Sequence, residues 1–110
     1  MAKTLLSIDV IGEGPDLVFR LDGELDIASA GTLRACLDSI DAGCRRVILD
    51  LSELRYMDSS GIGVLVEAYQ KLQPDLRGLV LRSPQRPVQR VLELSGLGTV
   101  VSIEDDGLPP

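Results

Sequence analysis

The segment Tyr56–Gly63, YMDSSGIG, is the part of the sequence whose residue types and spacing could do chemistry. It places adjacent hydroxyls at Ser59 and Ser60, and glycines at positions 61 and 63, between an aliphatic run and a segment of helical periodicity. A serine hydroxyl can act as a nucleophile or accept a phosphoryl group. The chain contains no histidine, and neither serine lies in a G-x-S-x-G motif, so a Ser-His-Asp hydrolase is excluded.

Two other patterns suggest ligand sites but have the wrong spacing. Gly61-Ile62-Gly63 is similar to the start of a dinucleotide fingerprint, but position 66 is valine, and the chain has no G-K-[ST] of a phosphate-binding loop. The carboxylates of the segment 22–26, DGELD, alternate as in a calcium loop. Glycine falls there at the second place instead of the sixth, however, and Leu33 stands at the twelfth, where a glutamate is needed.

The remaining carboxylates and the cysteines favour neither a catalytic nor a metal site. Asp50, Glu53 and Asp58 could face one another as an acid–base pair, but no histidine or lysine is nearby, so solvated carboxylates are the simpler interpretation. Cys36 and Cys44 have no histidine to complete a metal site, and a free cysteine is usually a small buried hydrophobe in a reducing compartment. We therefore expect no enzymatic activity, no cofactor and no metal.

The serine junction is physically suited to a reversible binding switch. Ser59 is a candidate N-cap, because a serine hydroxyl can accept from an amide two or three residues ahead. Gly61 and Gly63 each cost about 1 kcal/mol against alanine within a helix, which indicates that they keep the helix start bare for a binding partner. A phosphoryl group on Ser59 would add about −1.5 to −2 charges beside Asp58 and disfavour the docked partner through repulsion and desolvation.

The apolar pattern predicts the elements that position this junction. Alternating or continuous apolar runs indicate strands, and apolar residues every three or four positions indicate helices. Asp26 is a candidate cap for the first helix, whose apolar face would include Ile27, and Ser83 is a candidate cap for the third, with Pro84 at its first position. The predicted elements are strands at 5–11, 17–21, 46–51, 79–81 and 99–103, and helices at 26–40, 59–72 and 83–95.

The order of these elements predicts an α/β fold. Strands that alternate with helices imply right-handed crossovers and a mostly parallel sheet of four to five strands, to which the first two strands add an N-terminal β-hairpin. The continuous apolar run at 46–51 is typical of a central strand. Residues 1–103 form one predicted domain, and residues 104–110 are polar and proline-rich, which favours a flexible C-terminal tail.

Composition narrows the class of partner. The 110 residues include 17 acidic and 11 basic ones, a net charge of −6, so nucleic acid and anionic membranes are poor partners and a basic protein surface is a better one. The first residues do not resemble a secretory signal, and no apolar run reaches the length of roughly 18 residues that a membrane span needs. We expect a cytoplasmic protein.

Three segments together resemble a known family. They are LDGELDIASAGTLR at 21–34, LDLSELRYMDSSGIGVL at 49–65 and VLELSGLGTVV at 91–101, and they are similar, in order, to the STAS domain of bacterial anti-sigma-factor antagonists. The D-S-[ST]-G-[IL]-G box is the specific element. The likeness spans nearly the whole chain, although Pro87 and the proline-ended tail are not features that the family leads one to expect.

The resemblance implies partner switching. In such proteins the serine that follows the aspartate of the box, here Ser59, is phosphorylated by an anti-sigma factor that is a serine kinase. The unmodified antagonist binds that kinase and releases a sigma factor, phosphorylation ends the binding, and a PP2C-type phosphatase resets the serine. Asp26, Asp58, Ser60 and Gly61 match positions at or beside the kinase contact, and the bare Gly63 extends the predicted binding surface.

An alternative function remains open at this point. STAS domains also serve as non-switching scaffold subunits of stressosome-like or lipid-transport assemblies. Such a subunit would form stable stoichiometric complexes that do not respond to phosphatase treatment. The intact serine box favours the switching function.

Overall fold

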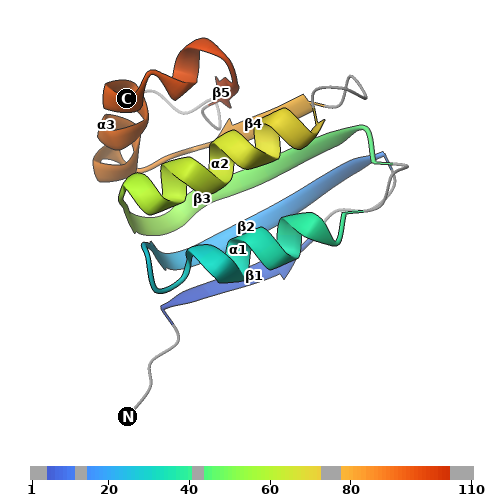
Figure 1. Cartoon of the computed structure of the whole chain (residues 1–110), viewed down its shortest axis with the longest axis horizontal. Coiled ribbons are helices and arrows are strands. Elements are labelled where there is room, and N and C mark those ends of the chain that lie inside the picture. Colours follow the sequence, from blue (N-terminus) through green and yellow to red (C-terminus); the bar gives the residue numbers. More distant parts are fainter. Residues whose placement is uncertain (1–4, 12–14, 41–43, 73–77, 105–110) are drawn as a thin grey trace.

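The computed structural model describes residues 5–11, 15–40, 44–72 and 78–104, which form a five-stranded sheet with three α-helices (Figure 1). The strand order is β1-β2-β3-β4-β5, with β1 antiparallel to β2 and the other three pairings parallel. The predicted α/β class, the N-terminal hairpin and the central place of the strand that begins at Arg46 are confirmed. The elements are β1 (Leu6–Val10), β2 (Asp16–Leu25), α1 (Ala30–Asp38), β3 (Arg46–Met57), α2 (Ser59–Leu72), β4 (Gly78–Arg82), α3 (Arg86–Ser95), the 3-10 helix η2 (Leu97–Thr99) and β5 (Ser102–Glu104).

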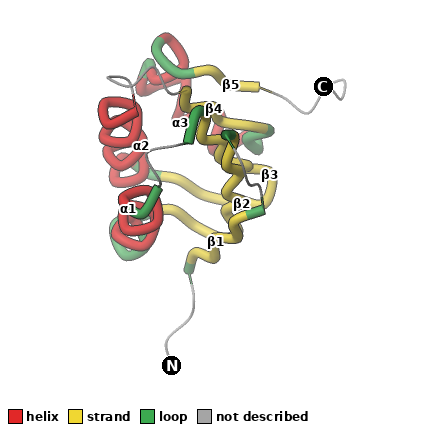
Figure 2. Tube along the Cα trace, turned by 90° about the vertical axis from the view of Figure 1, so that its right-hand side faces the viewer, coloured by secondary structure: helices red, strands yellow, loops and turns green. Residues whose placement is uncertain are grey.

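One face of the sheet is covered by α1 and α2, which lie in a separate layer from the strands (Figure 2). Because successive side chains of a strand point to opposite faces, alternate residues of β2 and β3 reach this helical layer. Leu21 and Leu49 belong to the resulting core, and Leu33 of α1 and Leu65 of α2 meet them with no exposed surface of their own. The burial of these aliphatic side chains holds the two layers together.

The opposite face of the sheet carries a row of alternating charges. The strand registers place one charged residue of each strand side by side, and the signs run minus, plus, minus, plus, minus from β1 to β5. Directly opposed unlike charges on neighbouring strands are favourable, and Arg20 Nε lies 3.7 Å from Asp50 Oδ2. The row is Asp9, Arg20, Asp50, Arg82 and Glu104.

Asp50 stands at the centre of this row and is largely enclosed. Burial by itself would raise the pKa of Asp50, but the amide of Ser52, at 3.0 Å, and its hydroxyl, at 2.7 Å, both donate to the carboxylate. The charges of Arg20 and Arg82 act in the same direction. The net result is a pKa of Asp50 below its usual value, so this carboxylate stabilises the sheet in its charged form.

The strands predicted from the sequence were too short for β2 and β3, which both continue past their predicted carboxyl ends. β3 continues from Leu51 to Met57, and its second half pairs with the extended end of β2 across register shifts near Gly23. Gly23 has a φ of +124°, and a Cβ at this position would collide with the carbonyl oxygen of Leu5, which accepts a hydrogen bond from the Glu24 amide at 2.7 Å. This local irregularity is invisible in the apolar pattern because only the backbone of glycine allows it.

Two predicted helix starts were also wrong. α1 begins at Ala30, after a turn, so Ile27 is not on its apolar face but 83% exposed. α3 begins at Arg86 and not at the predicted Ser83-Pro84, because Gln85 in an extended conformation is the N-cap and Ser83 takes a φ of 55°. α3 ends at Ser95 as predicted, before Gly96, which is left-handed with a φ of 76°.

The C-terminal strand starts later than predicted. Leu97–Thr99 form η2, so the last strand begins at Ser102 and includes Glu104, which the sequence assigned to the tail. Residues 105–110, where the tail is predicted, lie outside the described residues, as do residues 41–43 and 73–74, which follow the predicted ends of the first two helices. α1 ends at Asp38, before its predicted end at residue 40. α3 fills the space beside the second half of β3, where β4 no longer pairs, and Gln85 Nε2 donates to the Ser52 carbonyl at 2.6 Å.

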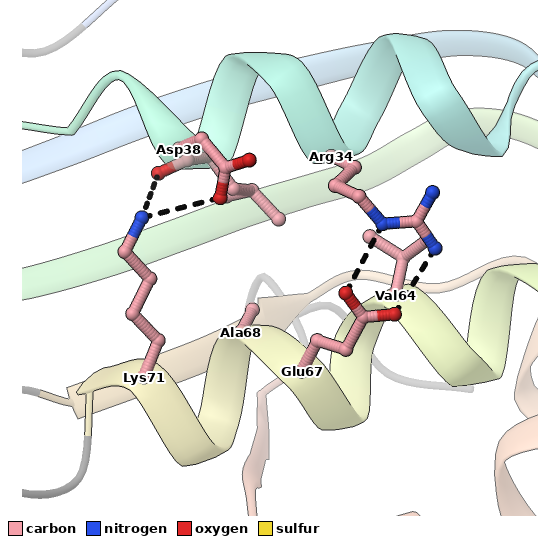
Figure 3. A pocket seen from close by; sticks show the side chains of 7 residues that line it. Arg34, Asp38, Val64, Glu67, Ala68 and Lys71 are labelled. Carbon is pink, nitrogen blue, oxygen red and sulfur yellow. Dashed lines mark hydrogen bonds and ion pairs between the residues drawn. The ribbon is translucent and has the colours of Figure 1, made fainter.

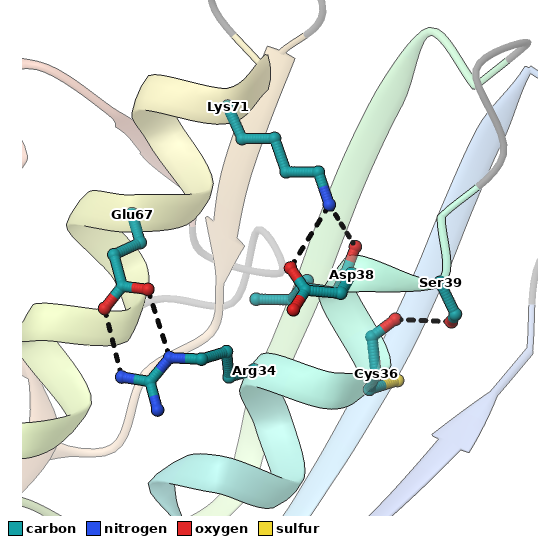
Figure 4. Close-up of polar contacts among 7 residues, drawn as sticks. Arg34, Cys36, Asp38, Ser39, Glu67 and Lys71 are labelled. Atoms are coloured by element: carbon teal, nitrogen blue, oxygen red, sulfur yellow. Dashed lines mark hydrogen bonds and ion pairs between the residues drawn. The ribbon is translucent and has the colours of Figure 1, made fainter.

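Ion pairs join α1 to α2 along their exposed sides. The guanidinium of Arg34 donates to both carboxylate oxygens of Glu67 at 3.0 Å, and Lys71 Nζ reaches Asp38 at 3.2 Å (Figure 3). Figure 4 shows the same pairs together with Ser39, whose hydroxyl donates to the Cys36 carbonyl at the end of α1. The hollow between these side chains is lined by both ion pairs and by Leu37, Val64 and Ala68.

Candidate functional site

The candidate site lies where β2 and β3 end together. Leu25 and Met57 are register partners at the carboxyl ends of the two parallel strands, and the Asp58 amide donates to the Leu25 carbonyl at 3.2 Å. The turn into α1 and the start of α2 therefore leave the sheet side by side (Figure 1). In open α/β sheets this edge is where binding sites are usually built.

The cap of α2 is Asp58 and not Ser59, which corrects the sequence-based expectation. Asp58 Oδ1 accepts the Ser60 amide at 2.9 Å, and its carbonyl accepts the amides of Gly61 and Ile62 at 3.0 and 3.2 Å. A carboxylate at this position also interacts favourably with the positive end of the helix dipole. Because Asp58 caps the helix, the Ser59 hydroxyl is not needed for this purpose.

Ser59 is the first residue of α2, and its side chain is exposed. Within the described part of the chain, its hydroxyl makes no hydrogen bond to another residue. Ser60 is half-buried, and its amide is taken up by the cap. Of the two adjacent hydroxyls, that of Ser59 is the more accessible to another protein.

The two glycines of the box occupy different environments, so the reason for a glycine differs between them. Gly61 is buried, and a Cβ there would lie 2.8 Å from Cγ of Leu25 and 2.8 Å from Cγ of Met57. Gly63 is exposed, and a Cβ there would meet nothing within 4 Å. The sequence-based idea that both glycines keep a surface bare therefore applies to Gly63, whereas Gly61 is required by packing against the sheet.

Asp26 organises the neighbouring turn. Its Oδ1 accepts the amides of Ala28 and Ser29 at 3.0 and 3.2 Å, while Ser29 Oγ accepts the Asp26 amide at 3.0 Å. The Ser29 hydroxyl donates to the Glu24 carbonyl at 2.7 Å, and Ser29 is only 3% exposed. This reciprocal arrangement is that of a capping box. Asp26 therefore acts as a cap, but it caps the turn that leads into α1.

The structure thus gathers the predicted site residues at one end of the sheet. The N-cap and first turns of α2 contribute Asp58, Ser59, Ser60, Gly61 and Gly63. The adjoining turn contributes Asp26. Sequence reasoning missed the exposure of Ile27 beside them, because it read this residue as part of an apolar helical face. The Asp26–Ser29 spacing, which is that of a capping box, is the signal that could have moved the helix start.

The described segments contain no group of three or more His, Cys, Asp or Glu side chains placed to hold a metal ion. In the same segments, none of the helices is both long enough and apolar enough to cross a membrane. The arrangement at the sheet end consists of an exposed hydroxyl, capping carboxylates and a bare stretch of helix. These groups can accept a modification and can contact another protein.

A comparison with protein families matches residues 7–106 to the STAS domain model. The chain belongs to the STAS domain family. This STAS domain is 33% identical over 92 residues to the anti-sigma F factor antagonist of Paenibacillus polymyxa, a match that covers 82% of this chain and 79% of that protein. It is 32% identical over 84 residues to the anti-sigma-B factor antagonist of Listeria monocytogenes, with 76% and 74% covered.

Solved structures show the same architecture. The unphosphorylated form of the anti-sigma factor antagonist SpoIIAA superposes with a TM-score of 0.77 at 26% identity, over 88% of this chain and 87% of SpoIIAA. The phosphorylated form of the Bacillus cell fate determinant SpoIIAA superposes with a TM-score of 0.69 at 25% identity, over 88% and 90%. The mostly parallel five-stranded sheet with its N-terminal hairpin is therefore a STAS fold.

Proposed function

We propose that this STAS domain is an anti-sigma-factor antagonist that binds an anti-sigma serine kinase while unphosphorylated, releases a sigma factor by doing so, and is switched off by phosphorylation of Ser59. The observation that carries the proposal is the exposed hydroxyl of Ser59 at the first position of α2, which makes no hydrogen bond to any of the described residues. The names of its relatives, which are antagonists of anti-sigma F and anti-sigma-B factors, support the same role.

The cap of α2 determines what a phosphoryl group on Ser59 would do. The amide of Ser60 is already bonded to the Asp58 side chain, and the amides of Gly61 and Ile62 are bonded to the Asp58 carbonyl. The phosphoryl group therefore finds few free donors, and it stands next to a carboxylate. Its charge of about −1.5 to −2 remains on the surface, so phosphorylation changes the docking surface and leaves the fold intact.

In the proposed switch, this charge weakens the docked complex. A kinase bound to unmodified Ser59 presents a surface that matches the acidic end of this STAS domain, and burial of a phosphoserine beside Asp58 in that contact adds repulsion and desolvation. Each 1.4 kcal/mol of this penalty lowers the affinity about tenfold. A PP2C-type phosphatase that removes the phosphoryl group from the exposed side chain restores binding.

Phosphorylation of the purified chain tests the proposal. The chain is incubated with ATP, magnesium and an extract of the source organism, and its intact mass and the peptide that contains Ser59 are analysed. We expect one added phosphoryl group that is absent in Ser59→Ala, is retained in the control Ser102→Ala at an exposed serine of β5, and is removed by a PP2C-type phosphatase. A labelled Ser59→Ala chain would refute the site assignment.

Binding provides the second half of the test. We expect Ser59→Ala to hold the kinase at least as tightly as the unmodified chain, and Ser59→Asp to hold it more weakly, because aspartate adds a negative charge at the contact. A stable complex that is unaffected by Ser59→Asp and by phosphatase would instead indicate a non-switching scaffold subunit.

A further inference from the structure

The turn between β2 and α1 presents an isoleucine to solvent next to the switch serine. Ile27 is 83% exposed, the highest value among the exposed large hydrophobic residues in the described part of the chain. It follows Leu25 by two residues, as Ser59 follows Met57, and Leu25 and Met57 are register partners. Ile27 and Ser59 therefore both follow the carboxyl ends of paired strands, at the same end of the sheet.

This turn holds Ile27 in one place. The reciprocal hydrogen bonds between Asp26 and Ser29 fix the residues on either side of it, and Ser29 is in turn bonded to the Glu24 carbonyl inside the protein. Because the backbone of this turn is already ordered, a partner that covers Ile27 has only the side chain left to order. The position is thus suited to an anchor residue, in contrast to an exposed isoleucine on a loose loop.

Other exposed apolar groups lie on the same elements. Val66 is seven residues after Ser59 and Gly63 is four residues after it, so all three occupy one face of α2. Gly63 leaves the backbone between them uncovered. Tyr56, 47% exposed, stands at the end of β3. A partner that reaches Ser59 along this face therefore meets the uncovered backbone at Gly63 and the partly exposed Val66.

The charges around this surface indicate which charges a partner must carry where it contacts Ile27. The ends of β2 and β3, residues 22–26 and 53–58, carry five carboxylates and one cation, Arg55, which is paired with Asp22 at 3.4 Å. Charge complementarity then requires basic groups at the rim of the partner. The five carboxylates are those of Asp22, Glu24, Asp26, Glu53 and Asp58.

We infer that Ile27 is the hydrophobic anchor by which this chain docks on its kinase, seated in an apolar pocket with a basic rim beside the kinase's phosphoryl-transfer site. The inference rests on the proposed function and adds a contact that it does not require. In this arrangement the acidic residues around Ile27 speed the encounter with the kinase. Burial of Ile27 slows dissociation of the complex, and Ser59 lies at the phosphoryl-transfer site. Buried anchors of this kind dominate the affinity of many interfaces.

A competition experiment tests the anchor separately from the phosphorylation. Phosphorylation of the unmodified chain by extract and ATP is measured while Ser59→Ala, which cannot be phosphorylated, is added as a competitor. The competitor is compared with Ser59→Ala chains that also carry Ile27→Ala, Ile27→Leu or Ile11→Ala. Ile11 is the matched control, because it is a 50% exposed isoleucine that follows β1 at the opposite end of the hairpin.

We expect Ile27→Ala to raise the half-inhibiting concentration about tenfold or more, Ile27→Leu to keep it within a few-fold, and Ile11→Ala to leave it unchanged. The ratio between parent and Ile27→Ala should persist at high salt, where screening weakens the charged rim. An Ile27→Ala competitor as potent as its parent overturns the anchor but not the proposed function. No phosphorylation of the unmodified chain, or no competition by Ser59→Ala, overturns both.

Discussion

The two glycines of the serine box make opposite predictions for the same substitution. In Gly61→Ala, the new Cβ would lie 2.8 Å from Cγ atoms of Leu25 and Met57 and 2.9 Å from Cδ2 of Leu25. Leu25 has no exposed surface and Met57 only 2%, so neither side chain can move outward. In Gly63→Ala, the new Cβ meets no atom within 4 Å.

The magnitudes follow from these contacts. Alanine improves helix propensity by about 1 kcal/mol at either position. Overpacking of a close-packed core typically costs about 1–3 kcal/mol. We therefore expect Gly61→Ala to lower the free energy of unfolding by up to about 2 kcal/mol and Gly63→Ala to raise it by about 0.5–1 kcal/mol.

Urea unfolding of the two variants and the unmodified chain, with the m-value compared across all three, measures both effects. The kinase competition described above then separates stability from binding, since a methyl group at Gly63 covers the bare backbone beside Ser59. Gly63→Ala should be more stable than the unmodified chain, and when combined with Ser59→Ala it should be a weaker competitor than Ser59→Ala alone. Equal unfolding midpoints for Gly61→Ala and Gly63→Ala would refute the packing argument, because only one of these sites is enclosed.

Two further outcomes are expected. Gly23→Ala should lower the free energy of unfolding by several kcal/mol, since φ is +124° there and the Cβ would collide with the Leu5 carbonyl; a midpoint in urea close to that of the unmodified chain would contradict this. The folded-state pKa of Asp50 lies below its unfolded value of about 3.8, so its stabilising contribution is present above that value and is lost as the pH falls through the folded-state pKa. Unfolding curves from neutral to acidic pH should therefore show the stability gap between the unmodified chain and Asp50→Asn narrow on acidification, and a gap independent of pH would exclude this role.

The order of the elements could be predicted from the sequence because it depends on the period of the apolar residues. The continuous run Val47-Ile48-Leu49 requires cover on both faces of its strand, and the three residues are at most 3% exposed. The spacing of Leu65 and Leu72 along α2 likewise places both in the core. Local periodicity reflects which face of an element is buried, and this is a property of the chain itself.

The element ends were less predictable. Ser59 and Asp58 are both good N-cap residues, and a cap is chosen by where the preceding strand stops. That point is set by the pairing of Met57 with Leu25, which is distant in the sequence. The start of α1 was displaced for a local reason, because the capping turn between Asp26 and Ser29 precedes the helix.

The sequence by itself determined that this chain forms a mostly parallel α/β sheet and that a D-S-S-G-I-G box lies between a strand and a helix, because periodicity and motif are local. Only the tertiary structure decided that Gly61 is a packing glycine and Gly63 a surface one, and that Ile27 is exposed beside Ser59. These distinctions depend on which side chains approach from other strands. The residues that neighbour these positions in the sequence do not determine those contacts.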